Sequence, residues 1–380
     1  MLKLTAYIFK NHNGGEYIWF RRVAEKLGLT LVVFWENESD ELLVKPSGTA
    51  NRAVWLIIRL ISGKNKERQQ GLYSLLGTYT YKIPVDREPI LMSSTYVPLP
   101  RSKNIIAYIH TPSRFLTIDF QDEIIRNSHR PLKIIYLRLW KFVYYFLYKS
   151  SMSRAAVIIA NSVNTQQRLK KYMGLDSVVI HPSVDIERFH CEKPDNYFFL
   201  PSRISPQKNQ LLALKAFRIF QESRKDFKLV LASTILKSEE NIQYLSSVRE
   251  FISKNNLSVE IMIGLDRTDI IKLYSSSFAC LFTGNDEDFG LVPVESMASS
   301  KPVIAIKEGG MTETIRDGVT GFLVSDEYQM AARMLELADN PERALKMGEK
   351  GRSIVESEFS DDVFIAKFKK LISDNGFPLE

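Results

Sequence analysis

Short apolar runs alternate with amphipathic stretches along most of the chain. Runs of about four to six apolar residues, bounded by Gly, Pro or polar residues, predict buried strands. These runs lie at residues 4–9, 31–34, 90–94, 105–109, 155–160, 178–180, 197–200, 228–232, 259–264, 278–282 and 302–306. Helices are predicted from Glu16, and over 51–70, 131–154, 210–224, 269–274, 327–338, 341–357 and 361–373. This alternation is typical of an α/β fold with parallel sheets.

The length of the chain predicts more than one domain. A chain of 380 residues exceeds what one hydrophobic core usually holds. Apolar periodicity stops around residues 183–195, where prolines and charges cluster. We therefore expect a first domain over residues 1–184 and a second over 185–358.

One stretch, residues 281–324, concentrates candidate chemistry. Glu287 stands before a loop that is predicted to turn into a helix, and Glu295 is predicted to lie in the first turn of that helix. Gly290 allows a positive φ or a close backbone approach, and Pro293 suits the first turn of a helix. The amides ahead of that helix carry partial positive charge, so an anion such as a phosphate fits there.

Charged and polar residues also follow other predicted strands. Arg203 and Lys208 bracket a loop before a helix, where two cations can neutralise a diphosphate without a metal. Gly15 belongs to a Gly-Gly turn at the carboxyl end of the first strand, where α/β sheets bind ligands. His110 ends another strand, just before Pro112. Solvated surface cations, a bare turn and a structural histidine are the simpler alternatives for these residues.

Taken in order, these segments resemble retaining glycosyltransferases of family 4. The donor-binding signature of that family is Glu, seven residues, Glu, a small-residue turn, a Pro-Val-Ile-Ala strand and a Gly-Gly turn, as in residues 287–310 here. The Arg-loop-Lys of residues 203–208 and the Tyr-Ile-His-Thr-Pro-Ser-Arg string of residues 108–114 are similar to further family motifs. The resemblance is closest to mannosyltransferase-like enzymes of polysaccharide assembly. It implies the GT-B fold, in which two Rossmann-like domains face a central cleft and a C-terminal helix, here 359–380, packs back on the first domain.

The resemblance also implies roles for individual residues. Arg203, Lys208 and the amides of Gly290, Leu291 and Val292 would take the diphosphate, with Gly15 close to it and Phe289 in the same loop. Glu295 would hold ribose hydroxyls, and the strand end at Gly264 would pass near the base. Glu287 and His110 would contact the sugar. The implied catalytic set is therefore Glu287, His110, Lys208 and Arg203.

The implied activity is that of a retaining hexosyltransferase. It would move a hexose, mannose first among them, from a GDP- or UDP-linked donor to a hydroxyl of a glycan or lipid-linked glycan. No Asp-x-Asp motif appears, so neither a metal nor another cofactor is expected. A carboxylate nucleophile is not marked either, so a front-face attack is the mechanistic hypothesis. A non-catalytic nucleotide-sugar-binding partner subunit and a GT-B sugar-nucleotide epimerase are the alternatives.

The sequence departs from the family pattern at two places. Ser233-Thr234-Ile235 stands where the family usually has Gly-x-Gly, which leaves the small-residue contact there open. Ser300 stands where the family mostly has Gly.

The two halves of the chain differ in charge. Residues 1–190 hold 27 Lys/Arg and 15 Asp/Glu (27 − 15 = +12), and residues 191–380 hold 24 and 29 (24 − 29 = −5). The basic half is suited to an anionic partner such as nucleic acid, an anionic bilayer or a phosphorylated acceptor. A merely soluble basic surface is the alternative. The acidic second half argues against nucleic acid as a partner.

Residues 131–154 are both aromatic and basic. Such a helix could lie on a membrane surface, or it could pack in the core with snorkelling Lys and Arg. Its apolar residues surround most of the helix, which favours the core. With two cysteines, Cys191 and Cys280, and neither a signal peptide nor a membrane span expected, the predicted location is the cytoplasm, with peripheral contact at the membrane face left open.

Overall fold

The computed structural model describes residues 5–9, 15–34, 90–93, 104–117, 119–126, 128–234 and 238–377. The chain forms two compact units. Unit 1 comprises Met1–His181 and Ile365–Glu380, and unit 2 comprises Pro182–Phe364. The predicted helix over 51–70 and the residue Gly14 lie outside the described residues.

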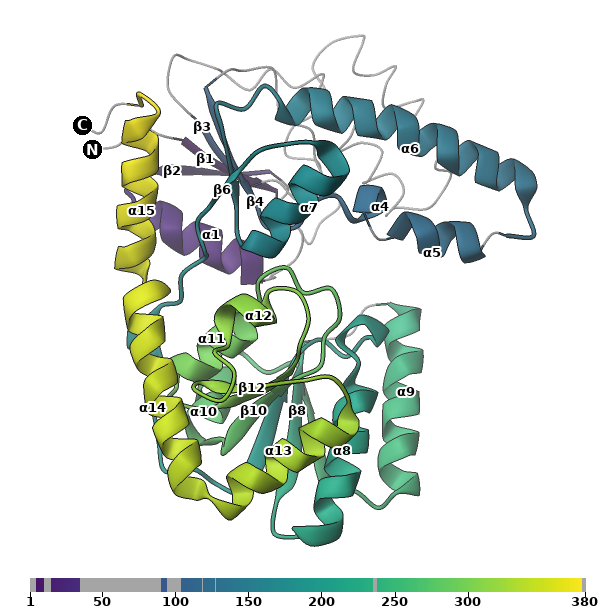
Figure 1. Ribbon diagram of the computed structural model, residues 1–380, viewed down its shortest axis with the longest axis vertical. Helices are drawn as coiled ribbons and strands as arrows, with labels where there is room; N and C mark the ends of the chain where they lie inside the picture. The colour runs from purple at the N-terminus through teal and green to yellow at the C-terminus, as the bar shows by residue number, and fades with distance from the viewer. Residues whose placement is uncertain are drawn as a thin grey trace. The chain divides into compact units, whose positions relative to one another are not determined.

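Unit 1 is built on a sheet of six parallel strands in the order β2-β1-β3-β4-β5-β6 (Figure 1). The strands are β1 (Thr5–Phe9), β2 (Thr30–Phe34), β3 (Ile90–Ser93), β4 (Ile105–Ile109), β5 (Val157–Ala160) and β6 (Val178–Val179). The helices are α1 (Gly15–Lys26), α4 (Arg114–Thr117), α5 (Asp119–Arg126), α6 (Pro131–Met152) and α7 (Val163–Met173), and the last helix α15 (Asp361–Asp374) ends in this unit.

The core of unit 1 explains why its strands could be predicted. Every residue of β3, β4 and β5 is buried, so each strand is a continuous apolar run rather than an alternating one. Tyr144, Tyr148 and Met152 of α6 pack against these strands, as do Leu169 and Met173 of α7. The predicted strands of this unit are confirmed.

Unit 2 is built on a second sheet of six parallel strands, in the order β12-β11-β10-β7-β8-β9. The strands are β7 (Tyr197–Pro201), β8 (Lys228–Ser233), β9 (Val259–Ile263), β10 (Ala279–Phe282), β11 (Val303–Ile306) and β12 (Gly321–Val324). The α-helices are α8 (Gln210–Ser223), α9 (Glu239–Lys254), α10 (Arg267–Ser276), α11 (Leu291–Ala298), α12 (Met311–Thr314), α13 (Glu327–Asp339) and α14 (Pro341–Glu358), with short 3-10 turns at Ile186–Arg188 and Pro206–Lys208.

The direction of winding reverses in the middle of this second sheet. From β7 the chain adds β8 and β9 on one side, then returns and adds β10, β11 and β12 on the other. Strands β7 and β10 are therefore neighbours, with Phe198 beside Ala279 and Phe199 beside Cys280. In open α/β sheets, ligands bind outside the carboxyl ends of the strands at such a reversal.

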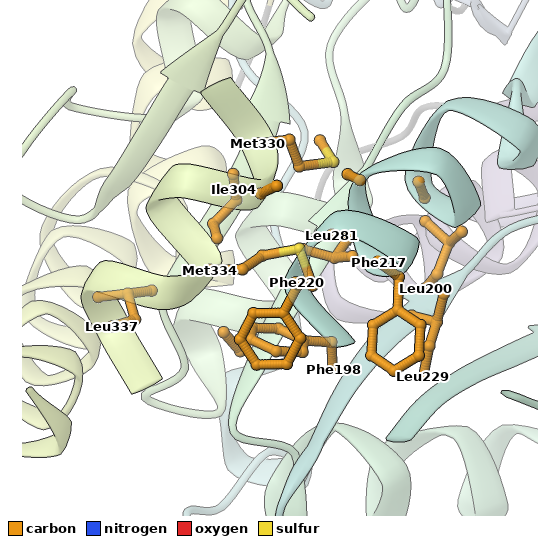
Figure 2. Packing of buried hydrophobic residues seen from close by; sticks show 14 of the residues in the cluster. Phe198, Leu200, Phe217, Phe220, Leu229, Leu281, Ile304, Met330, Met334 and Leu337 are labelled. Carbon is orange, nitrogen blue, oxygen red and sulfur yellow. The ribbon is translucent and has the colours of Figure 1, made fainter. Parts of the chain in front are cut away.

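Aromatic and aliphatic side chains fill the space between the second sheet and its helices. Figure 2 shows Phe198 of β7 beside Phe220 of α8, with Met334 and Leu337 of α13 nearby. The rings of Phe198 and Phe220 meet edge to face, with centroids 5.1 Å apart. This packing fixes β7 and α8, and with them the loop that joins the two elements.

The turn at Ser300 is conformationally strained. Ser300 follows α11 with a φ of +54°, in the left-handed region that glycine adopts at little cost. We expect Ser300→Gly to raise the free energy of unfolding by about 0.5–1 kcal/mol, because the relieved strain exceeds the added freedom of the unfolded chain. Urea denaturation measures this change. Ser299→Gly is the control: φ there is −88°, so it should leave stability unchanged or lower it.

Helix α6 differs from the prediction that favoured the core. Leu137, Tyr144 and Tyr148 are buried, but seven large apolar side chains from Leu132 to Phe146 are exposed. An apolar pattern all around a helix does not say which face the rest of the chain covers, so the prediction of a core helix holds for one face only. Among the described residues, no helix combines the length and apolarity needed to cross a bilayer.

Candidate functional site

The loop between β7 and α8 carries Arg203 and Lys208, and Gln210 holds it in place. Gln210 is 1% exposed and is the first residue of α8. Its side-chain amide donates to Oγ of Ser202 and to the carbonyl oxygen of Arg203, both at 2.8 Å. A buried amide with both donor bonds made is costly to displace. The loop is therefore a preformed platform for its two cations.

Ser233 supports the same loop from the next strand. The amide of Ile204 donates to Oγ of Ser233 at 3.0 Å, and the amide of Gly264 donates to its carbonyl oxygen at 2.9 Å. Ser233 thus stands where the family usually has glycine and uses its hydroxyl to brace the β7 loop. Gly264 ends the neighbouring strand with a φ of +81°, a conformation that favours glycine.

The loop after β10 is tied directly to the loop after β7. The hydroxyl of Thr283 donates to the carbonyl oxygen of Lys208 at 2.9 Å, and the amide of Asn285 donates to that of Gln207 at 3.0 Å. A Cβ on Gly284 would lie 2.9 Å from the ring of Phe282 and 3.1 Å from Cδ of Lys208. Glycine at 284 therefore leaves room for the lysine side chain.

Two residues singled out from the sequence meet at this junction. The ammonium of Lys208 donates a hydrogen bond to the carboxylate of Glu287 and lies 5.3 Å from the centroid of the Phe282 ring. The two side chains are 16% and 25% exposed, so the pair is partly screened from water but open on one side. The pair lies beyond the carboxyl ends of β7 and β10, where the sheet reverses direction.

The Phe289-Gly290 turn and the Gly309-Gly310 turn are locked together. The amide of Gly310 donates to the carbonyl oxygen of Glu287 at 2.9 Å. A Cβ on Gly310 would lie 2.4 Å from backbone atoms of Phe289, so a larger residue would displace the loop. Gly290 has the positive φ anticipated from the sequence, +88°, and caps α11.

The residues around Gly290 offer backbone rather than side chains to a ligand. The Phe289 ring is 3% exposed and packs edge to face on Phe359, with centroids 5.8 Å apart. Leu291 and Val292 open α11, and the first amides of a helix lack intrahelical acceptors. This part of the loop can therefore bind an anion through N–H groups.

Glu295 is placed differently from what the sequence indicated. It is the fifth residue of α11 and so lies beyond the first turn, because the helix already begins at Leu291, before Pro293. Its charge is balanced by Arg267, whose guanidinium makes two hydrogen bonds to the carboxylate, at 2.5 and 3.2 Å. The helix dipole, which fades after the first turn, contributes less there.

Arg267 is a site residue that sequence reasoning missed. It opens α10, three residues after the strand end at Gly264, and stacks over the Phe189 ring at 5.4 Å. Burial lowers the pKa of Arg267, but the charge and hydrogen bonds of Glu295 outweigh this effect and hold the pKa above its ordinary value. The sequence signal that could have identified Arg267 is a cation just beyond the end of a predicted strand.

In unit 1, His110 directly follows β4, and two aromatic rings hold its imidazole. The ring centroid lies 5.1 Å from that of Trp19 and 4.8 Å from that of Tyr108. Gly15 is the first residue of α1. Arg203 in unit 2 has an exposed side chain. The described residues contain no group of three or more His, Cys, Asp or Glu arranged to hold a metal ion.

Comparison with known proteins confirms the resemblance seen in the sequence. Residues 183–354 match the family model "Glycosyl transferases group 1". The human Alpha-1,3/1,6-mannosyltransferase ALG2 is 25% identical over 297 residues, which cover 72% of this chain and 68% of that protein. The Schizosaccharomyces pombe protein of the same name is 28% identical over 321 residues, covering 73% and 60%.

The fold has a counterpart among solved structures. Anabaena Alr3699/HepE, crystallised in complex with UDP-glucose, superposes with a TM-score of 0.67 at 17% identity, over 98% of this chain and 100% of that one. This similarity and the two parallel sheets confirm the predicted α/β, GT-B fold. Residues 183–354 therefore belong to the glycosyltransferase group 1 family, in a chain with the fold of GT-B glycosyltransferases.

Proposed function

We propose that this protein is a retaining hexosyltransferase that moves mannose from a nucleoside diphosphate sugar to a hydroxyl of a glycan or lipid-linked glycan. The observation that carries the proposal is the Lys208–Glu287 ion pair beyond β7 and β10 of unit 2. It combines a cation for a diphosphate with a carboxylate for sugar hydroxyls, at the edge of the sheet where such ligands bind.

The ion pair positions the ammonium of Lys208 for the departing diphosphate. The carboxylate of Glu287 accepts a hydrogen bond from the ammonium of Lys208 and holds it in place. A bound diphosphate would offer the ammonium a second anionic partner, while Glu287 accepts hydrogen bonds from the sugar. As the bond to the anomeric carbon breaks, negative charge grows on the phosphate, and a positioned cation lowers the energy of that transition state.

The remaining groups of unit 2 complete the donor site. Arg203 lies on the same braced loop, and its exposed guanidinium is suited to bidentate contact with phosphate. The first amides of α11 add N–H donors to the diphosphate. Glu295, held by Arg267, is assigned to the ribose hydroxyls. Arg203 and Lys208 supply positive charge where some transferases use a metal, so we propose metal-independent transfer.

Two residues of unit 1 retain their predicted roles as proposals. His110 would contact the transferred sugar, and its two ring neighbours limit the rotation of the imidazole. Gly15 would let the backbone at the start of α1 approach the diphosphate. The proposed attack comes from the same face as the departing phosphate, which accepts the proton of the acceptor hydroxyl, so the anomeric configuration is kept.

Mannose is proposed because of the relatives. The human and Schizosaccharomyces pombe proteins are named as α-1,3/1,6-mannosyltransferases, and both align with more than two thirds of this chain. The alignment spans 60% of the Schizosaccharomyces pombe protein. Specificity for the sugar depends on a few pocket side chains rather than on the fold.

Nucleotide sugars can be compared directly in a thermal-shift panel. A ligand at about 100 times its Kd should add about 2.7 kcal/mol to the unfolding free energy. We expect GDP-mannose or a UDP-sugar to stabilise the protein. When an acceptor is added in the presence of a metal chelator, we expect transfer to continue and NMR to identify an α-linked product. Failure of every nucleotide sugar to stabilise the chain would contradict the proposal. Conversion of the donor without an acceptor would indicate an epimerase. Binding of the donor without transfer to any acceptor would indicate a partner subunit.

Arg267→Ala tests how Glu295 is positioned. The substitution should raise KM for the donor about tenfold, corresponding to about 1.4 kcal/mol of binding, with a smaller change in kcat. It should also lower stability by about 1–3 kcal/mol, because the carboxylate loses its partner. Arg333→Ala is the matched control: Arg333 also pairs with a glutamate, Glu336, and stacks on a ring, Phe322. Equal KM values for the two variants would remove Arg267 from the site.

A further inference from the structure

Helix α6 of unit 1 is the long helix labelled in Figure 1. One of its faces is apolar and exposed. Seven large apolar side chains on it are each at least 40% exposed: Leu132 (82%), Ile135 (62%), Tyr136 (51%), Leu139 (63%), Phe142 (61%), Val143 (40%) and Phe146 (53%). At 3.6 residues per turn, they fall within a sector of about 120°. The seven side chains are here named the α6 apolar face.

The α6 apolar face lies opposite the side of the helix that packs on unit 1. Leu137, Tyr144, Tyr148, Ser151 and Met152 are buried, and they lie on the other side of the helix axis. The helix is thus apolar on two faces, only one of which contacts the core. Phe142 and Phe146 pack on each other, with ring centroids 4.7 Å apart, so part of the exposed face is already ordered.

Basic residues border the α6 apolar face, whereas the neighbouring helix α5 carries Asp119, Asp122 and Glu123. Residues 124–175 contain ten Lys/Arg and no Asp/Glu. On the helix itself, Arg138 and Lys149 flank one edge of the face and Lys133 lies beyond the other. Lys141 lies 4.0 Å above the ring of Phe120 and so fastens α5 to α6. An apolar stripe bordered by cations is the pattern of a helix that lies in a membrane interface.

The charge pattern favours an anionic bilayer over a second copy of the chain or nucleic acid as the partner of the α6 apolar face. A second copy docking by the same face would bring its own basic border against this one, and like charges facing each other oppose association. Nucleic acid would engage the cations but leave seven apolar side chains without a partner. An anionic bilayer satisfies both features at once, because its headgroups attract the cations and its acyl region accepts the apolar side chains.

We propose that the α6 apolar face docks unit 1 on the surface of an anionic bilayer, with α6 lying along the membrane. At 1.5 Å per residue the helix is about 33 Å long, so all seven side chains can reach the interface together. One consequence rests on the proposed function: docking would hold a transferase beside lipid-linked acceptors. The membrane contact itself does not depend on that function.

Vesicle co-sedimentation tests the proposal on the full chain. We expect the protein to sediment with vesicles that contain 30% phosphatidylglycerol in phosphatidylcholine, and to do so about tenfold less with phosphatidylcholine alone. Added salt should weaken binding, because it screens the attraction of the basic border. No nucleotide sugar is present, so this experiment can fail independently of the transferase proposal.

Two variants and one control identify the surface. Leu139→Glu combined with Phe142→Glu should reduce vesicle binding at least tenfold, while thermal stability stays near wild type because both side chains are exposed. Arg138→Ala combined with Lys133→Ala should remove most of the preference for anionic lipid. Ile242→Glu combined with Tyr328→Glu, at 50% and 70% exposed apolar positions of unit 2, should bind like wild type.

Three outcomes would overturn the proposal. The first is equal sedimentation with anionic and neutral vesicles, or wild-type binding by the Leu139→Glu, Phe142→Glu variant. The second is a wild-type dimer in solution that does not bind vesicles and that the same variant dissociates, which would assign the face to a second copy. The third is tight binding of duplex DNA that the variant retains, together with no binding of vesicles.

Discussion

Replacing Lys208 with alanine is expected to lower the rate of glycosyl transfer by about 100- to 1,000-fold. The ammonium of Lys208 is held by Glu287 beyond the carboxyl ends of β7 and β10. The charge that it neutralises develops as the diphosphate departs, so the loss should fall mainly on kcat. The fold should persist, because the loop is braced by Gln210 and by backbone bonds rather than by this side chain.

Lys228→Ala is the matched control for this prediction. Lys228 also forms an ion pair in unit 2, with Glu260 at 2.7 Å, but the two side chains are 47% and 43% exposed. Exposed pairs of this kind contribute about 0–1 kcal/mol to stability, and this one is remote from the loops of the proposed site. Steady-state kinetics at saturating donor, with circular dichroism as a check on folding, make the comparison. A Lys208→Ala enzyme as active as Lys228→Ala would exclude Lys208 from the site.

Glu287→Gln is expected to lower transfer by about 100-fold. The amide keeps the size of the side chain but loses the negative charge, so it accepts hydrogen bonds from sugar hydroxyls less strongly and no longer holds the ammonium of Lys208. A sugar that is misplaced by about 1 Å can lose a factor of this size. Glu260→Gln, in the exposed pair, is the matched control and should keep wild-type turnover.

Combining Lys208→Ala with Glu287→Gln tests whether the two residues act together. Lys208 and Glu287 are in direct contact, so removing both should cost less than the product of the two single losses. Multiplicative losses would show that the two residues act separately. Unchanged turnover in Glu287→Gln would remove that carboxylate from the reaction.

Much of the fold could be predicted from the chain because several strands of each unit are buried on both faces. Strands β3, β4, β5, β10 and β11 appear in the sequence as short continuous apolar runs, and the structure has a strand at each. Candidate site residues such as Lys208 and Glu287 could be proposed from the sequence because they follow such strands closely. In a parallel sheet, residues beyond neighbouring carboxyl ends share one edge.

Other parts of the site depend on contacts that spacing does not encode. Arg267 reaches Glu295 across 28 positions, and Gln210 acts through bonds to a loop behind it in the chain. Gly284 is required because the Phe282 ring and the Lys208 side chain both lie next to it. Glu295 was placed one turn too early, since the start of a helix is set by cap geometry at Gly290 rather than by Pro293. For helix α6 the sequence favoured the core over a membrane surface, because an apolar pattern does not show which face stays uncovered.

The most direct measurement is the structure of this protein with a bound nucleoside diphosphate. The account predicts a diphosphate oxygen at about 2.7–2.9 Å from Nζ of Lys208, the usual length of a charge-assisted hydrogen bond. It also predicts the first amides of α11 facing the same group. A nucleotide bound elsewhere, with the Lys208–Glu287 pair untouched, would contradict it.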